Sequence, residues 1–364
     1  MGKLNKLSKL FLLLFCMAAL FGCTRTRIID KISIVHIFGF DQAENDELIG
    51  TALFPDYTAN REGNQINSIE ERAPSTVLLA SKMAAHTSTP IELAKIRGLL
   101  FGRNIAEAGI RDIVDRLLLT PQIGTSIQII ASTHSAQETL NIFKKEKSFT
   151  LTEQIQHNME EQGLPKINLH IFLNHFYGEG MDAFVPMLTI DKNEKIKIEG
   201  IGVFKDDKLK LHLNLEETLL FSLIKDYRTQ SSYQIELDEQ TNRKEMLTVR
   251  TYQSKQEWDW DQKKEQLHLQ LRVQLSLTQV PNRYNVENRK DMQELEELVV
   301  EKLETGMKDL LSTLKENEVD PIGIGNIVRS KDKTWEKESF YQKYPNLPID
   351  VNVSVEIIHS GLES

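Results

Sequence analysis

Cysteine is almost absent from this chain. Only Cys16 and Cys23 occur among 364 residues, and both lie near the N-terminus. A fold held together by several disulfides is therefore excluded, and so are a cysteine nucleophile and a cysteine-ligated metal in the rest of the protein. Stability must come from an apolar core, and the hydrophobic content of 40% is typical of globular proteins that have one.

The usual signatures of hydrolases and nucleotide-binding proteins are also missing. No Gly-x-Ser-x-Gly or His-Glu-x-x-His sequence occurs. Gly200 and Gly202, like the Gly323–Gly325 segment, resemble pieces of phosphate-binding loops but lack a third glycine or a following Lys-Ser/Thr. His170 and His175 are spaced so that neither a helix nor a strand aligns them. We therefore expect no enzyme, no cofactor and no metal site.

Acidic side chains outnumber basic ones, and the net charge is −9. Such a surface repels nucleic acid, so we expect no nucleic-acid partner. Trp258-Asp259-Trp260 leaves two interpretations open, a carbohydrate platform or an exposed strand, and the acidic neighbours of this motif favour the strand.

Long apolar runs are confined to the first residues. Lys3, Lys6 and Lys9 precede the apolar run Leu10–Phe21, which is shorter than the roughly 20 residues that span a bilayer. This order of charge and hydrophobicity predicts a signal peptide over residues 1–22 rather than a transmembrane helix. Beyond it, no stretch approaches roughly 18 consecutive apolar residues.

The segment Leu20–Cys23 predicts a bacterial lipoprotein. Gly22 is the small residue that a lipobox needs before its acylated thiol, and cleavage between Gly22 and Cys23 would leave Cys23 to carry the lipid, such as palmitate. Two acyl chains give a stable anchor, whereas one holds only marginally. Phe21 is bulkier than usual, so ordinary secretion with a free Cys23 stays open as the alternative.

Apolar periodicity predicts strands and helices in alternation, which indicates an α/β (α+β) protein with mixed sheets flanked by helices. An Asp-Asp turn predicts a hairpin over Glu199–Leu209, and Asp291–Asn317 predicts a long amphipathic helix. The other expected strands are 32–41, 48–54, 95–101, 126–131, 234–237, 246–252, 267–277 and 349–357. The other expected helices are 76–85, 104–119, 136–143, 151–162 and 215–227.

A polar stretch around residues 191–197 suggests the main domain boundary. We expect a signal peptide over 1–22, a lipidated tether over 23–30, an N-terminal α/β portion over 31–196 and a C-terminal α/β portion over 197–364.

These features together resemble the Ger(x)C family, the lipoprotein C subunit of spore germinant receptors in endospore-forming bacteria. The resemblance depends on short motifs that follow one another along nearly the whole mature chain. The residues that carry it, besides Cys23, are Gly39, Asp41, Glu107, Gly109, Asp115, Gly200, Gly202, Phe204, Asp320, Gly323 and Gly325.

That resemblance implies a non-catalytic subunit of the receptor complex. Its partners would be two integral membrane proteins, the A and B subunits, in the spore inner membrane. Nutrients would trigger the complex, and the lipid anchor would hold this subunit on the outer face of the membrane. The family also implies three α/β domains of unusual topology, which would divide the N-terminal portion again.

Two other classes of protein would also be secreted and anchored to a membrane. A solute-binding lipoprotein of a transporter would show two similar α/β lobes joined by a hinge, and the sequence has no internal repeat. An envelope hydrolase would show a metal or nucleophile motif.

Overall fold

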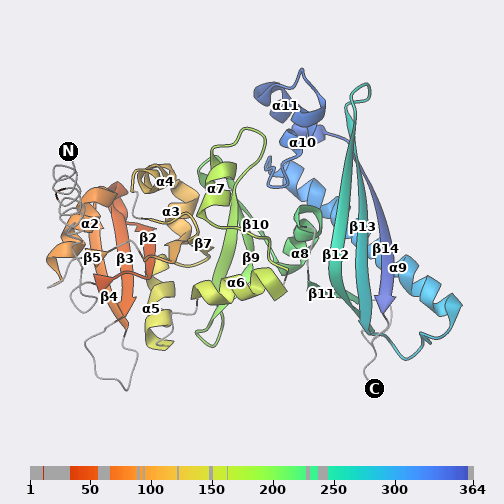
Figure 1. Ribbon diagram of the computed structural model, residues 1–364, viewed down its shortest axis with the longest axis horizontal. Helices are drawn as coiled ribbons and strands as arrows, with labels where there is room; N and C mark the ends of the chain where they lie inside the picture. The colour runs from red at the N-terminus through yellow and green to blue at the C-terminus, as the bar shows by residue number, and fades with distance from the viewer. Residues whose placement is uncertain are drawn as a thin grey trace, which may run out of the picture.

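The computed structural model describes residue 11 and residues 33–359, apart from 56–65, 88–90, 93–94, 121–122, 147–150, 162, 227–229 and 237–244. Two mixed sheets flanked by helices lie side by side along the longest axis of the molecule (Figure 1). A short parallel ladder joins β1 (Ser33–Ile34) to β5 (Ile91–Glu92). The mixed α/β class predicted from the sequence is confirmed.

The larger sheet has eight strands in the order β10-β9-β8-β7-β6-β2-β3-β4. Its central strands β2, β6, β7 and β8 run parallel, and antiparallel strands flank them on both sides. The strands are β2 (Ile37–Gln42), β3 (Leu48–Pro55), β4 (Ile66–Ala73), β6 (Gly98–Phe101), β7 (Gln128–Ser132), β8 (Phe184–Ile190), β9 (Ile196–Lys205) and β10 (Lys208–Leu213).

Helices cover this sheet because strands that are buried on both faces need apolar cover. α2 packs on β3 and β4, α5 on β2 and β3, and α7 on β7 and β8. The helices of this part are α2 (Thr76–Ala85), α3 (Arg103–Ala108), α4 (Arg111–Leu118), α5 (Ala136–Glu146), α6 (Leu151–Glu161) and α7 (Leu169–Phe176).

The smaller sheet has the order β11-β12-β13-β14. The strands are β11 (Ser231–Glu236), β12 (Met246–Asp261), β13 (Gln266–Gln279) and β14 (Ile349–His359), and β14 runs parallel to β13. Alternate apolar residues of β13, from Leu267 to Leu277, are buried. The long helix α9 (Arg289–Glu316) packs against β14 and buries its apolar stripe, as its periodicity predicted.

Helix α8 (Leu215–Lys225) connects the two sheets. It packs on β9 of the larger sheet, on β12 of the smaller sheet and on α9. Asn214 and Glu217 form a capping box at its start, which fixes where the helix begins. Two short α-helices, α10 (Ile324–Lys331) and α11 (Lys337–Lys343), follow α9 in the sequence.

Two predictions of secondary structure were wrong. The expected strand 32–41 is divided into β1 and β2, which belong to different sheets. The stretch 104–119 is two helices, α3 and α4, because Gly109 has φ 137° and cannot continue a helix. The N–H of Ile110 instead donates to the backbone oxygen of Asp207 at 3.0 Å. The break therefore connects this region to the β9–β10 turn.

The larger sheet continues through the domain boundary predicted at residue 196. β9 begins at Ile196 and pairs with β8 on one side and β10 on the other. The division of the chain into 31–196 and 197–364 stays a prediction, as does a further subdivision of the N-terminal portion.

Candidate functional site

Asp320 is the centre of a buried polar cluster between α9 and α10. Its side chain is 0% exposed. One carboxylate oxygen accepts the N–H groups of Gly323 at 2.9 Å and Ile324 at 2.7 Å. The other accepts the N–H of Gly325 at 2.8 Å and the hydroxyl of Tyr341 at 3.0 Å. These bonds satisfy N–H groups at the start of α10 that have no partner within the helix.

Glycine is required at both motif positions beside Asp320. Gly323 has a left-handed backbone, with φ 86° and ψ 38°, and a Cβ there would lie 2.3 Å from Met181 Cε. A Cβ on Gly325 would lie 2.7 Å from the Tyr341 hydroxyl and 3.1 Å from Gly180 Cα. The Asp-x-x-Gly-x-Gly pattern therefore lets the 178–183 loop approach the start of α10 closely.

Asp182, in that loop, binds Asp320 through two reciprocal hydrogen bonds. The Asp320 N–H donates to the Asp182 carboxylate at 2.7 Å, and the Asp182 N–H donates to the Asp320 backbone oxygen at 2.9 Å. Lys205, at the end of β9, forms an ion pair with Asp182 at 3.2 Å, and its Nζ lies 4.7 Å from the centre of the Tyr341 ring. The cluster thus ties the larger sheet to the segment that follows α9.

Lys225, at the end of α8, completes the cluster. Its Nζ donates to the Ile322 backbone oxygen at 3.0 Å. Burial lowers the pKa of Lys225 to about 8, against the opposing effect of the Asp320 and Asp226 carboxylates. Burial likewise raises the pKa of Asp320 to about 7, and the N–H groups of Gly325 and Ile324 act in the opposite direction.

The donors to the Asp320 carboxylate are fixed groups, namely three backbone N–H groups at the start of α10 and the Tyr341 hydroxyl of α11. A carboxylate held in this way is suited to joining chain segments, and it has little freedom to exchange a proton with a bound substrate. The hydrogen bonding of the cluster therefore favours a role in holding these chain segments together.

A cleft of about 340 Å³ borders the cluster. Lys205 and Tyr341 form one side of it, and Arg111, His175 and Tyr177 line it from α4 and α7. Its mixture of acidic, basic and aromatic groups has no single charge sign that would select one class of ligand.

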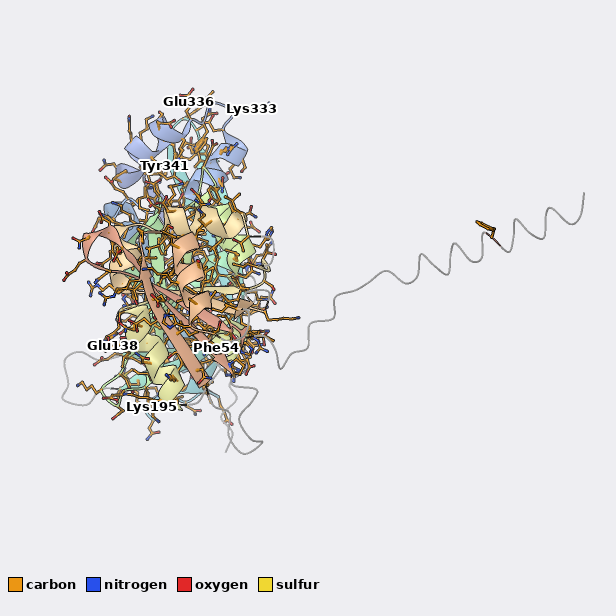
Figure 2. The ribbon with its side chains drawn as sticks, turned by 90° about the vertical axis from the view of Figure 1, so that its left-hand side faces the viewer. Phe54, Glu138, Lys195, Lys333, Glu336 and Tyr341 are labelled. Atoms are coloured by element: carbon orange, nitrogen blue, oxygen red, sulfur yellow. The ribbon has the colours of Figure 1, made fainter. Side chains whose placement is uncertain are left out.

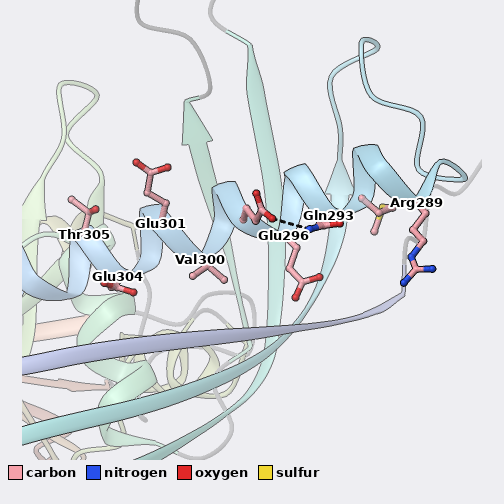
Figure 3. A pocket seen from close by; sticks show the side chains of 9 residues that line it. Arg289, Gln293, Glu296, Val300, Glu301, Glu304 and Thr305 are labelled. Atoms are coloured by element: carbon pink, nitrogen blue, oxygen red, sulfur yellow. Dashed lines mark hydrogen bonds between the residues drawn. The ribbon is translucent and has the colours of Figure 1, made fainter.

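Another cleft, of about 780 Å³, follows one side of α9 (Figure 3). Glu296, Glu301 and Glu304 line it, and Gln293 donates to Glu297 at 3.0 Å along the same helix. These residues form the polar face that the sequence predicted for this helix.

Asp41 marks a second structural site. It is buried at the end of β2, and its two oxygens accept the N–H groups of Ala136 at 2.7 Å and Gln137 at 2.8 Å, at the start of α5. A carboxylate there also interacts favourably with the helix dipole. Gly39 lies on the same strand, where a Cβ would come within 2.7 Å of Leu140 Cδ1 in α5.

The motif residues of α3 and α4 lie elsewhere. Glu107 forms an exposed ion pair with Arg103 at 2.8 Å. Gly109 lies against the β9–β10 turn, and Asp115 accepts a hydrogen bond from the Tyr177 hydroxyl, which joins α4 to the end of α7. These contacts are structural.

The motif residues of β9 also serve packing. A Cβ on Gly200 would lie 2.0 Å from the Leu213 backbone oxygen, and one on Gly202 would lie 2.7 Å from Leu209 Cδ1. Phe204 is fully buried and packs edge-to-face on Phe172.

The remaining sequence predictions fall outside the described residues. These are Gly22, Cys23, the signal peptide and the tether. The structure also adds four residues that the sequence prediction missed, namely Asp182, Lys205, Lys225 and Tyr341. Lys205 lies within the hairpin predicted over Glu199–Leu209, but the other three had no local signal because their partners are far away in the sequence.

The described part of the chain contains neither a group of metal-binding side chains nor a helix suited to crossing a membrane. No group of three or more His, Cys, Asp or Glu residues there could hold a metal ion. No helix among those residues has both the length and the apolar character needed to cross a membrane.

Comparison with protein families gives two adjoining matches. Residues 25–190 match the spore germination protein N-terminal domain, and residues 199–361 match the C-terminal domain described as spore germination B3/GerAC-like. Together the two matched domains cover most of the chain.

Individual relatives agree with these matches. The spore germination protein GerQC of Bacillus cereus is 25% identical over 94% of this chain and 96% of its own length. The putative spore germination protein YfkR of Bacillus subtilis is 21% identical over 82% of this chain and 80% of its own length. The crystal structure of GerBC matches with a TM-score of 0.58 at 16% identity, covering 88% of this chain and 97% of that one, and so shows the shared fold.

We predict that Asp320→Ala lowers the free energy of unfolding by roughly 3–5 kcal/mol, because it leaves the N–H groups at the start of α10 and the Tyr341 hydroxyl without their acceptor. Chemical denaturation measures this. Asp309→Ala, at an exposed position of α9, is the control and should change stability by less than about 0.5 kcal/mol. Equal stabilities of the two variants would contradict a central role for Asp320.

Because His175 is buried, we expect the free energy of unfolding to fall in acid. Burial lowers the pKa of His175 to about 4 from its ordinary value of about 6.5, so between these values the unfolded chain binds a proton and the folded chain does not. Stability is complete above pH 6.5 and falls as the pH drops, by about 2 kcal/mol at pH 5. His175→Gln should remove this loss, measured as the difference in unfolding free energy between pH 8 and pH 5. His170→Gln, exposed on the same helix, should retain it.

Proposed function

Since the chain belongs to the Ger(x)C family of spore germination proteins, we propose that it is a non-catalytic lipoprotein subunit of a spore germinant receptor complex. It would be needed for nutrient-triggered germination. The observation that carries this proposal is the pair of family matches, because they occur in order over residues 25–190 and 199–361.

The proposed location is the outer face of the spore inner membrane. Cys23 would carry the lipid there after cleavage behind Gly22, and the lipid would supply the membrane affinity. Only residues 24–32 separate Cys23 from β1, so the folded body stays close to the lipid surface. The proposed partners are the integral membrane A and B subunits of the receptor.

A solute-binding lipoprotein of a transporter is the competing function. Such a protein closes two similar lobes around its ligand by bending a hinge between them. Here the two sheets have eight and four strands and different topologies among the described residues. The reciprocal hydrogen bonds between Asp182 and Asp320 also oppose a hinge at this junction. Both observations favour the accessory subunit.

We expect a strain that lacks this gene to lose germination with one set of nutrients, while the purified protein binds none of those nutrients tightly. The physical reason is that the buried polar groups at the junction are committed to one another. Loss of spore optical density measures germination, and calorimetry with amino acids, sugars and nucleosides measures binding. Micromolar binding of one nutrient would favour the solute-binding class. Normal germination of the deletion strain with every nutrient would contradict the proposed role.

Cys23→Ala should yield a folded protein that no longer remains with membranes, because the proposed anchor is covalent lipid on that thiol. Membrane fractionation with a high-salt wash measures this. Cys16→Ala is the matched control, since Cys16 lies in the predicted signal peptide and its loss should leave the protein in the membrane fraction. Retention of the Cys23→Ala variant after the wash would show that partners or another anchor suffice.

A further inference from the structure

Helix α2 has an unusually apolar outer face. Leu79 and Met83 point inward onto the larger sheet, as expected for a helix that covers strands. On the exposed side, Val77 is 58% exposed and Leu78 is 49% exposed. The next outward positions are Ser81, Ala84 and Ala85, all exposed and uncharged. A surface helix normally carries charged or polar groups there, so this face lacks its usual solvation.

The only charged residue within α2 is turned to the side of the helix. Lys82 donates from Nζ to the backbone oxygen of Arg72 at 2.7 Å, at the end of β4. The outward face of α2 is therefore uncharged over its whole length of about 15 Å, and Ser81 is its one polar side chain besides the N-terminal Thr76.

A second exposed apolar group lies beside the start of α2. Leu118 and Leu119, at the end of α4, are 53% and 72% exposed. A cleft of about 640 Å³ lies between Leu119 and the start of α2, since Ser75 and Thr76 line it together with Leu119. Exposed apolar groups that gather on one face mark an interaction surface, whereas single ones do not. We define the apolar patch as the outward face of α2 with Leu118 and Leu119.

This patch lies at the end of the molecule where the described chain begins. β1 and α2 both contact β3, and α2 lies at the extreme left of Figure 1, far from α11 and β12–β14. Figure 2 looks directly onto this end. Nine residues lie between Cys23 and Ser33, and the ten Cα–Cα steps that join these two residues extend to at most about 35 Å. Both β1 and α2 contact β3, whose eight residues span about 27 Å, so this length of chain lets a lipid on Cys23 reach the surface beside α2.

We propose that the apolar patch rests on the lipid bilayer and fixes the orientation of the protein on the membrane. The inference rests on the proposed lipid anchor, which would hold the patch next to the surface. The anchor supplies the affinity, so a shallow contact of Val77, Leu78, Leu118 and Leu119 with the interface is enough to select one orientation.

Charge indicates which lipids take part. Three acidic residues, Asp46, Asp112 and Asp115, and one basic residue, Arg116, line the cleft beside the patch, and the chain is acidic overall. These groups give no net attraction to anionic headgroups, so the contact is apolar and does not require acidic lipid. Phosphatidylcholine vesicles are therefore a sufficient probe.

The experiment uses the full lipidated protein, in which acylation of Cys23 leaves no free thiol. Val77→Cys is labelled with an environment-sensitive fluorophore and reconstituted on phosphatidylcholine vesicles. We expect doxyl-labelled lipids to quench this label about twofold or more, and aqueous iodide to quench it weakly. Ser354→Cys is the matched control, because Ser354 is exposed on β14 at the opposite end of the molecule. Its label should respond to iodide alone.

Vesicle flotation separates this inference from the anchor itself. A protein that does not float with vesicles lacks the anchor, and the proposed lipoprotein character then fails. A protein that floats while the labels at 77 and 354 respond alike overturns the orientation proposal and leaves the anchor intact. Shielding of position 77 from both quenchers would indicate a second protein copy instead of lipid and would also overturn it. Leu119→Cys repeats the measurement independently of α2 and should behave like Val77→Cys.

Discussion

The reciprocal hydrogen bonds between Asp182 and Asp320 determine how the two halves of this protein meet. Each residue supplies both a donor and an acceptor, and the two residues are 138 positions apart in the sequence. Two neighbouring carboxylates in a buried site would normally be costly. Lys205 and Lys225 offset that cost from two different elements, and the N–H groups at the start of α10 satisfy the Asp320 oxygens. Because every member depends on the others, loss of one leaves its partners buried and unsatisfied.

The same constraint explains the glycines at the junction. The hydrogen bonds of Asp320 require the 178–183 loop and the start of α10 to be almost in contact, and a side chain at Gly323 or Gly325 would occupy that space. Similar close contacts occur between β2 and α5. There Asp41 binds the α5 N-terminus, and a Cβ on Gly102 would lie 1.8 Å from an Asp41 oxygen. In both places a carboxylate caps a helix: Asp41 caps α5 from a distant part of the chain, and Asp320 caps α10, which begins four residues after it.

Local physical signals made much of the fold predictable. The period-two strand β13 and the apolar stripe of α9 follow from the side-chain pattern alone, and both are correct. The break at Gly109 was missed because both flanking segments have helical periodicity, and the competing hydrogen bond comes from Asp207, far away in the sequence. The parallel pairing of β13 with β14 and the continuation of the larger sheet through residue 196 are also long-range features, which periodicity does not specify.

The candidate site shows the same division between local and distant information. Asp320, Gly323 and Gly325 were chosen as a motif, but only the structure gives their physical role, because Asp182 and Tyr341 belong to other elements. The motif formed by Asp320, Gly323 and Gly325 has no enzymatic signature. Its residues instead form the junction that holds the two different sheets in one arrangement. With the apolar patch at one end and the smaller sheet at the other, this junction sets how far the smaller sheet stands from the proposed membrane surface (Figure 1). The junction thus gives that sheet a constant height above the proposed membrane surface, which a hinged protein does not provide.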